Sequence, residues 1–172
     1  MGNMNKSITS ILMDEHSVIL KIIQSVDKWN NLWEKDDKKF EEEISKLISF
    51  CQNYADKIHH FKEEDLLFPK MIEYNPMLES GIIAELKEHH ELFRELIQNT
   101  IHLLQQKKYA DTFVTFKKYL SQLEDHIYIE NNELFPMADS FLSENEKENL
   151  YFRAMDFDSE NEKIKAKYLS FY

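Results

Sequence analysis

With only two glycines and three prolines among its 172 residues, the chain is poor in the residues that make turns. This composition argues against a β-rich fold and against a glycine-rich phosphate-binding loop. The 32 acidic and 21 basic residues give a formal net charge of −11, which disfavours binding to a nucleic-acid backbone. A single cysteine, Cys51, excludes an internal disulfide framework and a cysteine-based zinc or iron–sulfur site. The seven histidines are the unusual part of the composition.

The first residues lead directly into an amphipathic pattern, without the apolar stretch of a secretory signal. No run of about 20 apolar residues, the length needed to cross a bilayer, occurs anywhere in the chain. We therefore expect a cytoplasmic protein that binds neither membrane nor nucleic acid. Cys51 lies among apolar positions, and we expect it to be buried.

Apolar residues recur at helical spacing in four successive segments. The first runs from Ile8 to Trp29, and the polar run 33–39 connects it to the second, from Phe40 to Leu67. The pair Asn75-Pro76 closes that second segment, because proline removes a backbone donor and restricts the residue before it.

The third segment spans residues 82–104 and ends in the polar run 105–108, which we expect to be a solvated turn or helix end. The fourth spans residues 113–134 and is expected to stop around Pro136. Four long segments with short connections predict an all-α fold, an antiparallel up-down-up-down four-helix bundle.

Residues 1–140 are expected to form this bundle, and residues 141–172 a short C-terminal helical extension. The sequence Ser143-Glu144-Asn145-Glu146 fits a capping box, which begins a shorter helix. From Asp158 onward the pattern is compatible with a docked helix or with a frayed tail.

A motif of the form His-x3-Glu-x3-Leu-Phe-Pro occurs twice, 67 positions apart. Its first copy begins at His59 and ends at Pro69, and its second begins at His126 and ends at Pro136. The preceding segments repeat more faintly, with Glu15-His16 in the first and Glu88-His89 in the third. The chain therefore resembles two copies of one helical hairpin, each contributing a histidine and then His-x3-Glu.

The spacing of the motif has a chemical meaning. Residues four apart lie on one face of a helix, so a histidine and a glutamate at this spacing can reach one point. Four imidazoles and two carboxylates are too many ligands for one tetrahedral ion and suit two metal ions bridged by carboxylates. Iron or manganese fits such a mixed set of nitrogen and oxygen ligands, whereas structural zinc usually recruits cysteine.

The register of the first motif is ambiguous, because His60 and Glu64 have the same spacing as His59 and Glu63. The shared Leu-Phe-Pro anchor favours His59 and Glu63, and the Glu-His match favours His89 over His90. His60, His90 and His102 are therefore expected to lie outside the ligand set. The candidate metal ligands are His16, His59, Glu63, His89, His126 and Glu130.

At these residues, over roughly Ile8 to Pro136, the sequence resembles the hemerythrin-like HHE cation-binding domains. The resemblance implies a four-helix bundle with two non-haem iron ions, for which manganese or zinc can substitute, bridged by Glu63 and Glu130. It pairs His16 with His59 on one iron, and His89 with His126 on the other.

The two motifs look especially like those of the repair-of-iron-centres branch, which acts on iron–sulfur clusters after nitric oxide or oxidative damage. Oxygen-carrying members differ, with His-x3-His on the third helix and His-x4-Asp on the fourth, where this chain has Phe93 and Asn131. We interpret the missing histidine as an open coordination position, which suits reactivity more than reversible oxygen carriage.

The resemblance implies a role in nitrosative or oxidative stress, through chemistry on NO, O2 or peroxide, or through iron donation to damaged iron–sulfur proteins. A non-enzymatic carrier or sensor of O2 or NO is the alternative. A helical interaction module without metal is a third possibility. The sequence does not indicate an oligomeric state.

Overall fold

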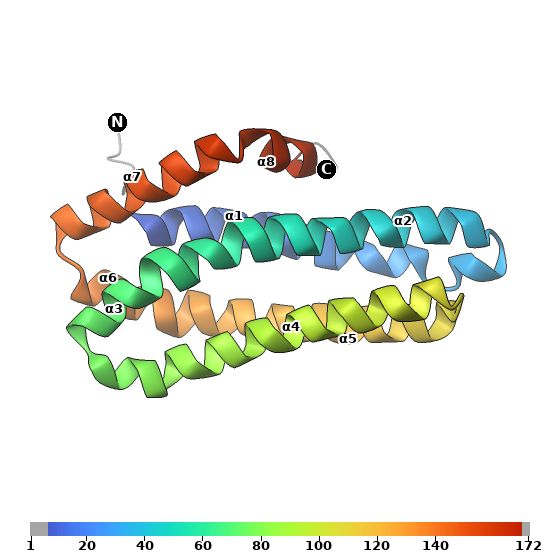
Figure 1. Cartoon of the computed structure of the whole chain (residues 1–172), viewed down its shortest axis with the longest axis horizontal. Helices are drawn as coiled ribbons and strands as arrows, with labels where there is room; N and C mark the ends of the chain where they lie inside the picture. The colour runs from blue at the N-terminus through green and yellow to red at the C-terminus, as the bar shows by residue number, and fades with distance from the viewer. Residues whose placement is uncertain (1–6, 170–172) are drawn as a thin grey trace.

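The computed structural model describes residues 7–169, and every regular element in that range is helical. Long helical rods lie side by side along the longest dimension of the molecule, with connections at both ends (Figure 1). The predicted all-α class is therefore confirmed, and the rods form a helical bundle.

The first rod and its connection follow the sequence pattern. Helix α1 (Ile8–Ser25) is capped by Ser7, whose hydroxyl accepts a hydrogen bond from the Ser10 backbone N–H at 3.1 Å. The 3₁₀ turns η1 (Val26–Trp29) and η2 (Leu32–Glu34) follow. The connection therefore begins earlier than the predicted run 33–39 and ends before that run does, because α2 begins at Asp37.

The second rod is one continuous helical path whose hydrogen-bonding pattern changes along its length. It begins as α2 (Asp37–Phe50), becomes π-helical in η3 (Cys51–His60) and η4 (Lys62–Leu67), and returns to α-helix in α3 (Phe68–Tyr74). The 3₁₀ turn η5 (Pro76–Ser80) follows, so Asn75-Pro76 ends the rod as predicted.

Helices α4 (Ile82–Gln105) and α5 (Tyr109–Ile129) lie side by side, joined by a tight turn at which Lys107 adopts a positive φ of 58° (Figure 1). The last rod continues from α5 through the π-helical η6 (Glu130–Leu134) into α6 (Phe135–Phe141). The predicted stop at Pro136 is therefore wrong. Proline is tolerated in the first turn of α6, where its missing N–H falls at the change from π- to α-helical bonding.

The C-terminal segment forms α7 (Glu144–Glu160) and α8 (Glu162–Leu169), which pack along α1, η3 and η4. The predicted capping box is confirmed, because the Glu146 carboxylate accepts a hydrogen bond from the Ser143 backbone N–H at 3.0 Å. Tyr168 is buried, and its hydroxyl lies 2.7 Å from that of Ser49. Up to residue 169, the segment is docked on the bundle.

Buried apolar side chains form two clusters in the described part of the chain. One contains residues such as Ile19, Ile97 and Phe116, and the other contains residues such as Leu12 and Phe68. The buried histidines and glutamates lie where one cluster gives way to the other along the rods, as at His16, which follows Leu12 of the second cluster and precedes Ile19 of the first. Cys51 is buried in the first cluster, as predicted, and burial raises the pKa of its thiol to about 12.

None of the helices formed by residues 7–169 combines the length and the apolarity needed to span a bilayer.

Candidate metal centre

Five imidazoles and two carboxylates meet in the interior between the two apolar clusters. They come from all of the rods, and each of them is at most 1% exposed. These residues are His16 on α1, His59 and His60 on η3, Glu63 on η4, His90 on α4, His126 on α5 and Glu130 on η6.

The first group contains His16, His59, Glu63 and Glu130. The Nε2 atoms of the two imidazoles are 2.9 Å apart. Glu63 Oε1 lies 3.2 Å from His59 Nε2, and Glu130 Oε2 lies 3.2 Å from His16 Nε2. One ligand atom from each residue lies within 4.8 Å of the others, which is the spacing of donors around a common cation.

The second group contains His60, Glu63, His90 and His126. The Nε2 atoms of His90 and His126 are 3.1 Å apart. Glu63 Oε2 lies 3.5 Å from His90 Nε2, and Glu130 Oε1 lies 3.1 Å from His126 Nε2. Glu63 and Glu130 therefore each present one oxygen to a histidine of the first pair and the other oxygen to a histidine of the second.

The carboxylates are not satisfied by the protein alone. Both oxygens of Glu63 and of Glu130 are buried and lack a hydrogen bond within the described residues, although imidazole nitrogens lie 3.1 to 3.5 Å from these two carboxylates. His60 Nε2 is also buried and also lacks a hydrogen bond within the described residues. Buried carboxylates in this condition are costly unless a cation compensates them, so these residues fit a metal site.

Each of the five imidazoles has a polar partner at Nδ1, the ring nitrogen that faces away from the centre of the cluster. A hydrogen-bonding group outside the cluster lies within 3.3 Å of each Nδ1, so that Nε2 is directed to the centre. The pairs are His16 with Asn131 (2.8 Å), His59 with Glu15 (3.2 Å), His60 with Asp56 (3.3 Å), His90 with Glu64 (2.7 Å) and His126 with His89 (3.3 Å).

Arg94 orients two of these outer carboxylates. Its guanidinium lies 2.9 Å from Asp56 Oδ1 and 2.9 Å from Glu64 Oε1. Burial opposes ionisation of both carboxyls, but the hydrogen bonds from His60 or His90 and from Arg94 outweigh it and lower both pKa values to about 2. Asp56 and Glu64 are therefore anionic acceptors at neutral pH.

Burial also lowers the pKa values of His60 and His90 to about 4, so both imidazoles are neutral at pH 7, the form that binds metal. At His59 burial acts in the same direction, but the charge of Glu63 and the hydrogen bond to Glu15 outweigh it and raise the pKa to about 10. The carboxylate-rich side of the centre therefore attracts positive charge, whether that of a proton or of a metal ion.

The π-helical segments overlap the two copies of the motif. η3 and η4 contain His59, His60 and Glu63, and η6 begins at Glu130. A π-turn holds more residues than an α-turn, and π-turns occur frequently at functional sites. The wider turn allows the adjacent His59 and His60 to face the interior together with Glu63. An argument based on α-helical spacing could not place His60 there.

Five of the six predicted ligands lie in the cluster, and the sixth, His89, does not. His89 is half-buried and touches His126 from outside, whereas His90 is fully buried in the second group. The buried positions of α4 explain the difference, because positions 83, 86, 90, 93, 97 and 100 form a single stripe at spacings of three and four, with 96 beside it. That stripe is visible in the sequence and selects His90. His102 is exposed near the end of α4.

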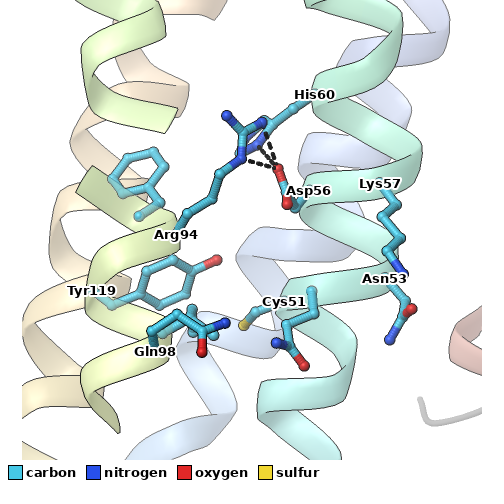
Figure 2. Close-up of a pocket in the computed structure, with 11 residues that line it drawn as sticks. Cys51, Asn53, Asp56, Lys57, His60, Arg94, Gln98 and Tyr119 are labelled. Atoms are coloured by element: carbon cyan, nitrogen blue, oxygen red, sulfur yellow. Dashed lines mark hydrogen bonds and ion pairs between the residues drawn. The ribbon is translucent and has the colours of Figure 1, made fainter. Parts of the chain in front are cut away.

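A cavity of about 190 Å³ between η3 and α4 reaches the centre at His60. Figure 2 shows Arg94 extending to Asp56 beside His60, with Cys51, Gln98 and Tyr119 along another part of the wall. Its volume admits several water-sized molecules, and His60 is the residue of the second group that lines it.

The hemerythrin HHE cation-binding domain model matches residues 7–138, which include every histidine and glutamate of the cluster. The chain therefore belongs to the hemerythrin HHE cation-binding domain family, as the motif predicted. No match was found among curated proteins or among solved structures.

Proposed function

We propose that this chain is a non-haem di-iron protein whose rods form an up-down-up-down four-helix bundle. His16 and His59 bind one iron, and His90 and His126 bind the other, with His60 as a further ligand. Glu63 and Glu130 bridge the two ions. The observation that carries this proposal is that each carboxylate directs its two buried, unpaired oxygens toward histidines of different pairs.

The donor set supports iron. Imidazole nitrogen and carboxylate oxygen together suit iron and manganese, and no thiolate is available, because Cys51 is absent from both donor groups. Zinc and manganese are expected to occupy the same ligands when iron is withheld.

The protein residues orient the ligands and limit the access of water. Nδ1 of each imidazole is held by an outer partner, and Phe135 stacks on His16 with ring centroids 5.4 Å apart. The apolar clusters on both sides keep the carboxylates out of bulk solvent, which strengthens their attraction for a cation. Two bound iron ions would supply redox equivalents and positions for a small ligand.

The small ligand we propose is O2, NO or peroxide, and the setting is nitrosative or oxidative stress in the cytoplasm. The cavity beside His60 supports this choice, because its volume suits molecules of a few atoms. Donation of iron to damaged iron–sulfur proteins is a second outcome of the same chemistry, in which those proteins are the partners. Reversible O2 or NO binding without turnover would identify a carrier or sensor.

The test is anaerobic reconstitution with Fe(II), followed by metal analysis and by optical and Mössbauer spectra before and after addition of O2 or NO. We expect about two iron ions per chain and the signature of a magnetically coupled ferric pair after oxidation. Consumption of NO or peroxide would identify an enzyme, and iron transfer to an apo-cluster protein would identify a donor.

Ligand variants provide the control. His59→Ala and Glu63→Ala should lose iron, whereas His102→Ala, which changes an exposed histidine outside the cluster, should retain it. Iron content near zero in the wild-type protein, or equal content in all four proteins, would contradict the proposal.

A further inference from the structure

A group of four charges lies between the metal centre and the C-terminal helices, with Lys62 and Glu15 buried and Asp158 and Lys165 partly buried. Lys62 Nζ is fully buried and lies 2.6 Å from Glu15 Oε1 and 2.6 Å from Asp158 Oδ1. Lys165 Nζ lies 2.7 Å from the same Glu15 oxygen and also contacts Asp158. Two lysines and two carboxylates give this group a net charge of zero.

The group touches a candidate ligand directly. The second oxygen of Glu15, Oε2, lies 3.2 Å from His59 Nδ1, while His59 Nε2 points into the centre. Glu15 is therefore a positioning residue for His59. Its other oxygen is held by Lys62 from η4 and by Lys165 from α8. The C-terminal segment therefore contacts Glu15, and Glu15 in turn contacts the candidate ligand His59.

Packing of the C-terminal segment, α7 with α8, against the bundle positions Lys165 and Asp158 beside Glu15 and Lys62. Phe157 stacks on Phe61 with ring centroids 4.0 Å apart, and Tyr168 is buried against Phe50 and Ser49. Both helices lie beyond residue 138, where the family match ends. The contact is thus made by a part of the chain that the HHE domain does not include.

We propose that the C-terminal segment tunes the metal centre, with Lys165 and Asp158 setting the charge around Glu15 and thereby the donor strength of His59. This inference rests on the proposed function, since it concerns the same metal ions. It assigns a role to two helices that contribute no ligand.

The proposal predicts opposite effects of two neighbouring changes. Lys165→Met leaves the four-charge group with a net charge of −1, which favours binding of a cation and the more highly charged oxidation state. Asp158→Asn leaves it at +1, which disfavours both. Both changes weaken docking of α7 and α8, so a role limited to docking would shift the metal affinity in the same direction for both.

The experiment measures Co(II) affinity by chelator competition and the midpoint potential of the iron-loaded protein by spectroelectrochemistry. Compared with wild type, we expect Lys165→Met to bind Co(II) about threefold to tenfold more tightly and to have a lower potential. Asp158→Asn should bind more weakly by a similar factor and have a higher potential. Lys165→Arg keeps the charge and should restore wild-type values.

Lys163→Met is the matched control, because Lys163 lies exposed on the same helix, α8. Urea denaturation of each variant establishes that it is folded. Unchanged affinities, or shifts of the same sign in both variants, would overturn the inference while leaving the metal centre intact. Absence of metal from the wild-type protein would instead overturn the proposed function.

Discussion

His89 and His90 are neighbours in sequence with different chemical surroundings. His90 is fully buried, with Nε2 toward Glu63 and Nδ1 2.7 Å from Glu64. His89 is half-buried and lies 3.3 Å from His126 Nδ1, on the side away from the centre. The two residues offer a matched pair of substitutions that separates a ligand from a group that supports a ligand.

Replacement of His90 by alanine should lower metal affinity at least tenfold, because it removes one imidazole and leaves Glu63 with one fewer partner. His89→Ala should keep about two metal ions per chain, with a smaller loss of affinity. Metal analysis after reconstitution, followed by chelator competition, measures both effects. A greater loss in His89→Ala than in His90→Ala would restore the ligand assignment favoured by the Glu-His repeat.

Lys62 should contribute strongly to stability. Its ammonium group is fully buried and contacts both Glu15 and Asp158. Lys62→Met leaves Asp158 with Lys165 alone and leaves Glu15 with Lys165 and His59. We expect a loss of about 3 kcal/mol in the free energy of unfolding, measured with urea on the metal-free protein. The exposed Lys163→Met should change it by less than about 0.5 kcal/mol. Equal stability of the two variants would show that the buried charges are not coupled.

Most of the centre could be predicted from residue types and spacing. The repeated motif marks His59, Glu63, His126 and Glu130, because an inward histidine and carboxylate on one helical face have few other uses. His60 and His90 could not be selected in this way. The inward position of His60 depends on a π-turn, which has no simple sequence pattern. The choice of His90 requires that the apolar stripe of α4 be preferred as evidence over the Glu-His repeat, which is only two residues long.

At the scale of the helices, the periodicity of apolar residues predicted the elements well and their ends less well. The connection near residues 33–36 and the end at Asn75-Pro76 follow from polar and proline residues. Pro136 did not end a helix. It lies in the first turn of α6, where the hydrogen-bonding pattern changes from π- to α-helical, so a backbone N–H at this position would lack its usual carbonyl partner and its absence is tolerated. Rules based on single residues miss such changes, since a π-turn has no simple sequence pattern.

The junction of α3 with α7 should depend on acid. Glu146 accepts hydrogen bonds from the Ser143 hydroxyl, the Tyr74 hydroxyl and the Ser143 backbone, which lower its pKa from 4.5 to about 2. Because the pKa is lower in the folded state, the stabilisation is complete above about pH 4.5 and is lost as the pH falls towards 2.

Glu146→Gln should therefore be less stable than wild type at pH 6, and the difference should narrow as the pH falls below about 4.5. Urea denaturation at a series of pH values measures the difference. Glu148→Gln, an exposed change on the same helix, should differ little from wild type at any pH. A Glu146→Gln difference that is constant from pH 6 to pH 3 would contradict the assigned hydrogen bonds.

At the scale of the whole molecule, the polar centre separates two apolar clusters and contains buried carboxylates that the protein does not pair. Metal should therefore stabilise the fold. At a free metal concentration of about 100 times Kd, we expect a gain of about 2.7 kcal/mol, or roughly 5 to 10 °C in Tm. Calorimetry of chelated and iron-loaded protein tests this expectation, and equal Tm values would count against the site.

The positions of Glu63 and Glu130 between the two donor groups also predict how the centre would fill. On the proposed function, an ion held by His16 and His59 would fix one oxygen of Glu63 and one of Glu130, and would leave the remaining oxygens directed toward His90 and His126. The first binding event would thus organise the second position, while two cations sharing these carboxylates would repel each other. We expect the orientation effect to dominate at substoichiometric metal. Native mass spectrometry of protein given one equivalent of Co(II) should then show mainly empty and doubly occupied chains, with few that carry a single ion.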